Sequence, residues 1–244
     1  MLEEQRTTMK KYRYVAEIPA RIGSQRVKQK NLRLINGKPM IAYSIEACKN
    51  SCKIDKIYVN TDSDTIGKVG TDYGVEYFKR DPRLAKDDIK QDEFNYDFLL
   101  KVECDAVVMV NPVAPLIEAD DIDNAIEYFE ENGFDSLITV KNEQLHSFYC
   151  NEPLNFDTNA LLPATQDIEP VQICTWTISI WKKETFIKAY EEKGYAAFNG
   201  KLGLWKIDPI KTVKISYEED FLMAEQLIKA RHMSSDDIEI KYYS

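Results

Sequence analysis

The most basic stretch of the chain begins just after its first predicted strand. Residues 18–31 read Ile-Pro-Ala-Arg-Ile-Gly-Ser-Gln-Arg-Val-Lys-Gln-Lys-Asn, and Arg21, Arg26 and Lys30 carry charge suited to phosphate oxygens. A loop that follows the first strand of an α/β sheet lies at the carboxyl edge, where ligands of such sheets bind. We therefore expect this loop to hold a triphosphate and to stabilise the charge that grows on a leaving pyrophosphate.

Two smaller residues of this loop also suit an anion. Gly23 would let the backbone pass close to a ligand, and Ser24 would donate its hydroxyl or its backbone N–H. Two common phosphate motifs are excluded, because no Gly-Lys-Ser/Thr follows and the three glycines of the dinucleotide fingerprint are absent. The alternative to a phosphate site is a solvated basic loop in an otherwise acidic protein.

Strand and helix patterns alternate along the chain and must position this loop. The apolar run 106–110 is typical of a parallel strand that is buried on both faces. We predict strands at 12–18, 56–60, 75–79, 106–110, 136–140, 175–181 and 212–215. We predict helices from Pro39 onward and at 63–73, 92–102, 120–131, 183–192 and 218–230. The alternation predicts an α/β fold, three-layer and doubly wound around a mostly parallel sheet, and the length predicts a single domain over residues 1–244.

Composition and charge exclude several classes of protein. A net charge of −9 argues against binding to a nucleic-acid backbone, which needs clustered Lys and Arg. The longest apolar runs fall far short of the roughly 20 residues of a membrane span, and residues 1–11 lack the apolar stretch of a secretory signal. The five cysteines are too scattered for a disulfide framework, and Cys48 and Cys52 lack a second pair for zinc. We expect a cytoplasmic protein without nucleic-acid or membrane partners.

Several motifs of the chain resemble the acylneuraminate and Kdo cytidylyltransferase family. Residues 20–31 are similar to its Ala-Arg-x-Gly-Ser-x-Arg…Lys-Asn signature, and residues 32–39 are similar to its Leu-x-Gly-Lys-Pro-Leu segment. The further segments that resemble the family are 58–64, 80–87, 111–116 and 218–225. Because the likeness covers nearly the whole chain, it implies a nucleotide-diphospho-sugar transferase-like fold.

The resemblance implies a reaction between CTP and an acidic sugar. The anomeric hydroxyl of a 2-keto-3-deoxy sugar acid attacks the α-phosphorus of CTP, which releases pyrophosphate and forms a CMP-sugar. Such a transfer needs positioning and charge neutralisation, so Arg21, Arg26 and Lys30 are the catalytic candidates. The implied nucleotide site consists of Ala20, Arg21, Gly23, Ser24, Asn31, Arg80, Gln91, Asn111 and Pro112. The candidates for binding the sugar, a nonulosonic or octulosonic acid, are His146, Gln166 and Trp176.

The metal-binding positions of the family differ in this chain. Family members place an Asp-x-Asp pair before the last helix to hold magnesium, the expected cofactor, but Lys214 and Ser216 stand at those positions. Magnesium favours carboxylate oxygens, which neither residue supplies. Three explanations stay open: another acid (Asp208, Glu218 or Asp220) holds the metal, Lys214 itself neutralises phosphate charge, or catalysis is impaired. For Asp220, stabilisation of a helix N-terminus is an equally good interpretation.

Residues 141–173 interrupt the alternation of strands and helices with prolines and several Asn and Asp residues. In relatives, the segment at this place is an arm that embraces a second subunit, so the resemblance implies an inserted dimerisation arm and a homodimer. His146 and Gln166 would then contact the sugar across the interface; an ordinary surface excursion is the alternative. Thr175-Trp176 replaces the Asn-Gly of the family, so a related nonulosonic or octulosonic acid is as admissible a sugar as N-acetylneuraminate itself.

Two other functions are compatible with this pattern. Related folds transfer other nucleotides to a sugar 1-phosphate, which is a second enzymatic reading. The substitutions at 214 and 216 also permit a nucleotide-binding homologue without activity.

Overall fold

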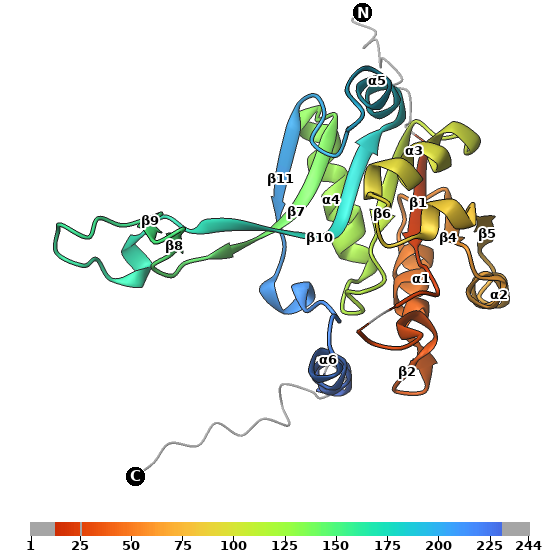
Figure 1. The fold of residues 1–244 in the computed structure, drawn as a ribbon, viewed down its shortest axis with the longest axis horizontal. Helices are drawn as coiled ribbons and strands as arrows, with labels where there is room; N and C mark the ends of the chain where they lie inside the picture. Colours follow the sequence, from red (N-terminus) through yellow and green to blue (C-terminus); the bar gives the residue numbers. More distant parts are fainter. Residues whose placement is uncertain (1–12, 25, 231–244) are drawn as a thin grey trace, which may run out of the picture.

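A seven-stranded sheet forms the centre of the molecule (Figure 1), as described for residues 13–24 and 26–230 of a computed structural model. The predictions for residues 1–11 lie outside these ranges. In spatial order the strands are β11 (Leu202–Lys206), β7 (Ser136–Glu143), β10 (Val171–Lys182), β6 (Ala106–Val110), β1 (Tyr14–Pro19), β4 (Lys56–Thr61) and β5 (Glu76–Lys79). Only β10 runs antiparallel to its neighbours, so the prediction of a mostly parallel sheet is confirmed.

Helices cover both faces of this sheet. One face packs against α1 (Met40–Asn50), α2 (Asp64–Asp72) and α4 (Ala119–Asn132) through a buried cluster that includes Ile45, Ile66 and Ile126. The other face packs against α3 (Gln91–Lys101) and α5 (Lys183–Lys193) through a cluster that includes Phe98 and Phe186. All five residues of β6 are buried between the two layers, which explains why its sequence is uniformly apolar. The three-layer prediction is confirmed.

A third, smaller cluster lies beside the sheet and holds the loop that follows β1. It joins Val27 of that loop to α6 (Glu218–Ala230), to the start of α1 and to the hairpin of β2 (Leu34–Ile35) and β3 (Lys38–Pro39). Val27 is 1% exposed although its neighbours Arg26 and Lys28 are exposed. One apolar residue therefore anchors an otherwise basic loop to the body of the protein.

The strand predicted at 212–215 is wrong. These residues instead follow and partly form a short 3-10 helix, η4 (Pro209–Thr212). Asp208 accepts the N–H of Ile210 (2.9 Å), and Pro209 fixes the first position of that turn, so local capping outweighs the β-branched residues that follow. The sheet is completed by β11, a parallel edge strand that the pattern did not predict.

The interrupted segment 141–173 projects from the sheet as an arm (Figure 1). Its base is regular, because β7 continues to Glu143 and pairs with the first residues of β10. Beyond the base the arm contains only β8 (Phe148–Tyr149), β9 (Glu152–Pro153) and the short η3 (Thr165–Asp167). The pairing of β10 with β7 is irregular between Cys174 and Ser179, where Trp176 adopts a φ of 56°. This irregularity marks the point at which the arm leaves the body.

Among the helices of the described residues, none combines the length and the apolar character of a membrane span.

Candidate functional site

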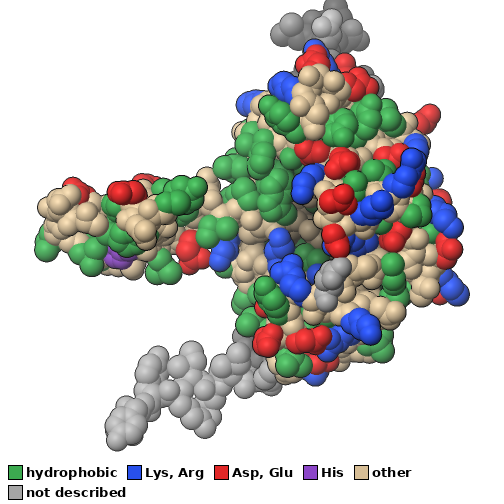
Figure 2. Space-filling model, in the orientation of Figure 1, with side chains coloured by type: hydrophobic (Ala, Val, Ile, Leu, Met, Phe, Trp, Pro, Cys, Tyr) green, Lys and Arg blue, Asp and Glu red, His purple; other side chains and the backbone are tan. Residues whose placement is uncertain are grey.

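A cleft of about 410 Å³ opens at the carboxyl ends of β1 and β6. Figure 2 shows Lys and Arg side chains gathered around a hollow in this part of the body. The cleft lies between the loop after β1, the start of α3, the turn after β6 and the segment that leads into α6. Its lining residues are Pro19, Arg21, Ser24, Arg26, Lys30, Asn31, Arg80, Gln91, Phe94, Met109, Asn111, Pro112, Val113 and Ser216.

Backbone contacts fix the loop after β1 at both ends. Ala20 donates its N–H to the carbonyl of Asn60 (2.9 Å), which extends the pairing of β1 with β4. Asn31 donates from Nδ2 to the carbonyl of Arg21 (3.2 Å), which closes the loop on itself. Together with the buried Val27, these contacts hold the three cations of the loop at the cleft.

The three cations differ in how far they are already compensated. Arg21 pairs with Asp87 (2.6 Å), an exposed pair that solvent screens, and Arg26 lies over the ring of Tyr217 with 5.0 Å to its centroid. Within residues 13–24 and 26–230, no acid forms an ion pair with Lys30, whose Nζ donates to the carbonyl of Ile215 (2.7 Å).

The charge of Lys30 is poorly accommodated without a ligand. Its pKa is lowered to about 8, first by burial and then by the positive charges of Arg26, Lys214 and Arg21, with Asp220 acting in the opposite sense. Burial also lowers the pKa of Lys214. An anion in the cleft would relieve both effects, because it would offset the mutual repulsion and replace lost solvation.

Arg80 supplies a fourth cation from the residue that follows β5. It is only 4% exposed, and its guanidinium lies over the ring of Phe94, 4.2 Å from the centroid. Its Nε and Nη2 donate to the side-chain and backbone oxygens of Asn60, each at 2.9 Å. The side chain is therefore fixed from two directions while it lines the cleft.

Two amide side chains leave polar atoms free at the cleft. Nε2 of Gln91 and Oδ1 of Asn31 are buried and have no hydrogen-bond partner among the described residues. Buried polar atoms are normally satisfied, and both residues line the cleft. One donor and one acceptor are therefore available to a bound molecule.

The structure brings together most of the residues predicted for catalysis and nucleotide binding. Arg21, Ser24, Arg26, Lys30, Asn31, Arg80, Gln91, Asn111 and Pro112 all line the cleft. Ala20 is buried behind it instead, where its backbone N–H bonds to Asn60. Gly23 is not in the lining, and a Cβ there would meet nothing within 4 Å among the described atoms, so its close approach to a ligand stays a prediction.

The predicted sugar-binding residues do not line the cleft. His146 bonds through Nε2 to the carbonyl of Pro163 (3.0 Å) inside the arm. Gln166 also lies on the arm, in η3, and Trp176 packs against the ring of Phe198 with 5.3 Å between centroids. Their role in sugar binding stays a prediction, and for the two arm residues it requires a second subunit.

The acids considered as magnesium ligands are already used in local structure. Asp208 caps η4, and Glu218 pairs with Arg33. Oδ2 of Asp220 accepts the N–H groups of Ser216 and Tyr217, both at 2.8 Å. No carboxylate lines the cleft, and the described ranges contain no group of three or more His, Cys, Asp or Glu that could hold a metal ion. These residues do not fit a magnesium ion held by the protein.

Five lining residues were missed from the sequence: Pro19, Phe94, Met109, Val113 and Ser216. For two of them, the spacing from a predicted site residue could have indicated the contact. Phe94 follows Gln91 by three residues in a helix, and Met109 precedes Asn111 by two residues at the end of a strand, so each pair shares one face. Ser216 was singled out only at a metal-binding position of the family, and it reaches the cleft through the short segment 213–217 between η4 and α6.

Comparison with known proteins identifies the family of the chain. A family model described as cytidylyltransferase matches residues 15–198. The chain is 31% identical over 238 residues to the post-translational flagellin modification protein B of Campylobacter coli, covering 90% of this chain and 97% of that protein. It is 32% identical over 168 residues to the CMP-N,N'-diacetyllegionaminic acid synthase of Legionella pneumophila, covering 64% of this chain and 70% of that one. The chain spans about half the length of the curated N-acylneuraminate cytidylyltransferases that it also matches.

A solved structure of CMP:2-keto-3-deoxy-manno-octonic acid synthetase in complex with CTP has a similar fold. The TM-score is 0.70 at 15% sequence identity, and the match covers 90% of this chain and 99% of that one. At this identity the likeness concerns the fold alone, and it agrees with the three-layer architecture described above. Because the family model matches more than half of the chain, and because a relative is 31% identical over nearly its whole length, this chain belongs to the cytidylyltransferase family.

Proposed function

We propose that this protein is a CMP-sugar synthetase, which joins CTP to a nonulosonic or octulosonic acid and releases pyrophosphate. The observation that carries the proposal is the cleft itself, where Arg21, Arg26, Lys30 and Arg80 gather in a chain of net charge −9. The names of the relatives support the class of reaction, since one of them is a CMP-N,N'-diacetyllegionaminic acid synthase.

In the proposed reaction the triphosphate lies along the loop after β1. The hydroxyl of the acidic sugar attacks the α-phosphorus, and the bond to the bridging oxygen of the β-phosphate breaks. Negative charge then grows on the leaving pyrophosphate, where Arg26 and Lys30 would stabilise it. The cytosine and ribose would occupy the other end of the cleft, beside Arg80 and the free amide of Gln91.

Charge neutralisation in this proposal rests on side chains. Lys214 stands behind Lys30 with no acid as an ion-pair partner in the described part of the chain, so it adds positive potential where relatives are expected to hold a metal. Magnesium dependence remains a prediction in which the ion arrives with the triphosphate rather than on carboxylates of the protein.

The proposal includes a homodimer in the cytoplasm, with the arm as the contact between subunits. Large apolar side chains are exposed along the arm, and Leu161 is 95% exposed. Such side chains are typical of a surface that a partner covers. Sedimentation velocity would test this: wild type sediments as a dimer, and Leu161→Asp combined with Leu162→Asp shifts it to a monomer. A wild-type monomer would refute the dimer and leave the enzymatic proposal intact.

The enzymatic proposal is tested by incubating the protein with CTP and a panel of 2-keto sugar acids. We expect pyrophosphate release and a CMP-sugar product, detected by mass spectrometry, only when a suitable acid is present. Nucleotide-dependent thermal shifts provide the second readout, with CTP stabilising more than GTP or UTP. Tight CTP binding without turnover for any acid would identify a non-catalytic homologue, and preference for another nucleotide would favour sugar 1-phosphate chemistry.

A further inference from the structure

A carboxyl group lies buried in the central strand of the sheet, behind the cleft. Glu17 of β1 is 0% exposed, and along the strand it alternates with residues of the opposite face. On its own face lie apolar residues such as Val15 and Met109. Burying a carboxylate among such neighbours is unfavourable, and burial raises the pKa of Glu17 to about 7 although Arg80 and Asn60 act to lower it. Apolar packing of the sheet therefore gives no reason for a carboxyl at this position.

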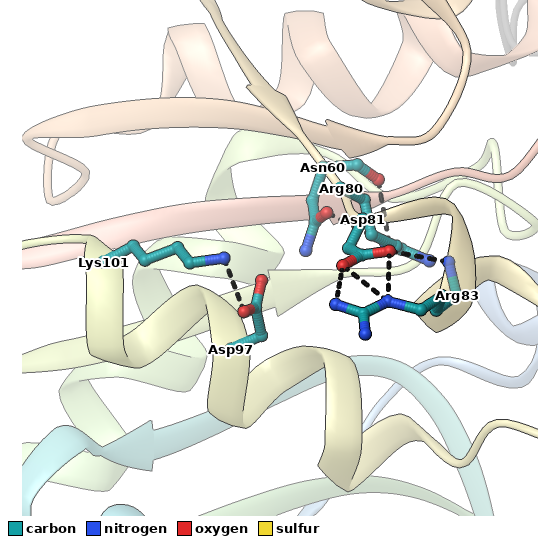
Figure 3. A network of polar contacts seen from close by, with 6 residues as sticks. All are labelled: Asn60, Arg80, Asp81, Arg83, Asp97 and Lys101. Atoms are coloured by element: carbon teal, nitrogen blue, oxygen red, sulfur yellow. Dashed lines mark hydrogen bonds and ion pairs between the residues drawn. The ribbon is translucent and has the colours of Figure 1, made fainter.

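A chain of hydrogen bonds leads from this carboxylate to the cleft. Asn60 at the end of β4 donates from Nδ2 to Oε1 of Glu17 (2.5 Å), and its Oδ1 accepts from Nε of Arg80 (2.9 Å). The backbone oxygen of Asn60 accepts from Nη2 of the same guanidinium (2.9 Å), and Figure 3 shows the two residues together. Because Oε1 of Glu17 accepts from Nδ2, the oxygen of the Asn60 amide is the end that faces the arginine.

This arrangement leaves part of the guanidinium free for a ligand. Of the five N–H groups of Arg80, the one on Nε and one on Nη2 are used, and the described residues show no acceptor for the other three. The ring of Phe94 restrains the guanidinium plane. The free N–H groups therefore belong to a side chain of fixed orientation that lines the cleft.

We infer that Glu17 and Asn60 are positioning residues, which hold Arg80 so that its unused N–H groups face the nucleotide. The inference rests on the proposed function, because it takes the ligand of the cleft to be a nucleotide. Other charged or titratable groups also surround these hydrogen-bonded residues. Asp62, Asp97 and Arg21 influence Arg80, and Cys104 lies near enough to Glu17 to be affected by it. Glu17 is the only acid that this hydrogen-bond chain joins to Arg80 within the described ranges.

The experiment measures CTP affinity by calorimetry and folding by thermal unfolding. In Glu17→Leu we expect CTP to bind about tenfold more weakly while the melting temperature stays within a few degrees of that of wild type, because removing a buried carboxyl offsets the cost of leaving Nδ2 of Asn60 without its acceptor. Glu17→Gln keeps an acceptor oxygen for Asn60, so its affinity should remain within about threefold of wild type. As a matched control, Ser136→Ala removes a buried hydrogen bond to Asn199 (2.7 Å) at the other end of the sheet and should lower stability without changing affinity.

A double-mutant cycle with Arg80→Ala separates positioning from a general effect on the fold. If Glu17 acts through Arg80, Glu17→Leu has no further effect on CTP affinity once Arg80 is removed. An equal loss of affinity in both backgrounds, or unchanged affinity in Glu17→Leu, would overturn the inference while the proposed function stands. A wild-type chain that does not bind CTP would overturn both.

Discussion

Two segments of the chain border the cleft as its walls, and their charged residues are of opposite kinds and are used differently. On the wall formed by residues 20–31 and Arg80, the cations are compensated only in part, and Lys30 has no acid partner in the described structure. On the wall formed by residues 208–220, only Ser216 lines the cleft, and Asp208, Glu218 and Asp220 are each engaged away from it with nearby N–H groups or with Arg33. In the proposed account, unused bonding capacity, rather than residue type, marks the wall to which the ligand binds.

The largest expected effect comes from removing the least compensated cation of the first wall. Lys30→Met keeps the apolar stem but loses the charge, so kcat/KM for pyrophosphate release should fall on the order of a thousandfold. The exposed Lys28 of the same loop does not line the cleft, and Lys28→Met should stay within about twofold of wild type. Equal losses in steady-state assays of the two variants would mean that the loop acts only through its overall charge.

Glu17, which lies behind the first wall, should make the free energy of unfolding depend on pH. The pKa of Glu17 rises from 4.5 to about 7 on folding, so the folded state keeps the proton longer and the stability falls as pH rises through this interval. At 1.36 kcal/mol per pKa unit the loss approaches about 3 kcal/mol. Urea unfolding of wild type and Glu17→Gln at pH 4.5 and 7.5 should show this difference in slope. Parallel pH profiles would show that Glu17 titrates normally.

Carboxylates can be introduced where the second wall borders the cleft. In the absence of nucleotide, we expect wild type to bind Mn²⁺ only weakly, because no carboxylate lines the cleft. The combined change Lys214→Asp and Ser216→Asp should increase Mn²⁺ affinity at least about tenfold, because carboxylate oxygens suit such hard cations. Electron paramagnetic resonance of free Mn²⁺ measures both. Tight binding by wild type would reveal a metal site in which the acids of this wall take part.

The smallest effect separates the capping role of Asp220 from a catalytic one. Asp220→Ala removes the acceptor for two N–H groups at the start of α6, which should lower the free energy of unfolding by about 1 kcal/mol. The kcat/KM should change by no more than about threefold, since the side chain does not line the cleft. A hundredfold loss of kcat/KM with unchanged stability would assign Asp220 to the reaction.

The sequence predicts this molecule best where local signals are strong. The apolar run of β6 and the alternation of strands and helices indicate the layered sheet, and the basic loop after β1 indicates the site. The strand expected at 212–215 is wrong because β-branched residues are typical of strands but do not by themselves form one. Here a capped turn and isolated backbone hydrogen bonds, such as that from the N–H of Ile215 to the carbonyl of Val113, hold these residues in place. In physical terms, the spacing of apolar residues indicates which side chains are buried, but it does not indicate which segments pair as strands.

The hydrogen bonds that join Glu17, Asn60 and Arg80 could not be predicted from the sequence, for a different reason. Glu17 and Asn60 are separated by 43 residues, and they meet only because Pro19 is in register with Asn60 in the pairing of β1 with β4. A glutamate within an otherwise apolar strand was the single available hint. Register is fixed by the packing of the whole sheet, so no local pattern reveals it.

A crystal structure of the protein with CTP tests the central claim most directly. We predict the β- and γ-phosphates within hydrogen-bonding distance of Arg26 and Lys30, and the cytosine end of the nucleotide beside Arg80. A triphosphate that turns away from the loop after β1, or a nucleotide bound outside the cleft, would contradict the account.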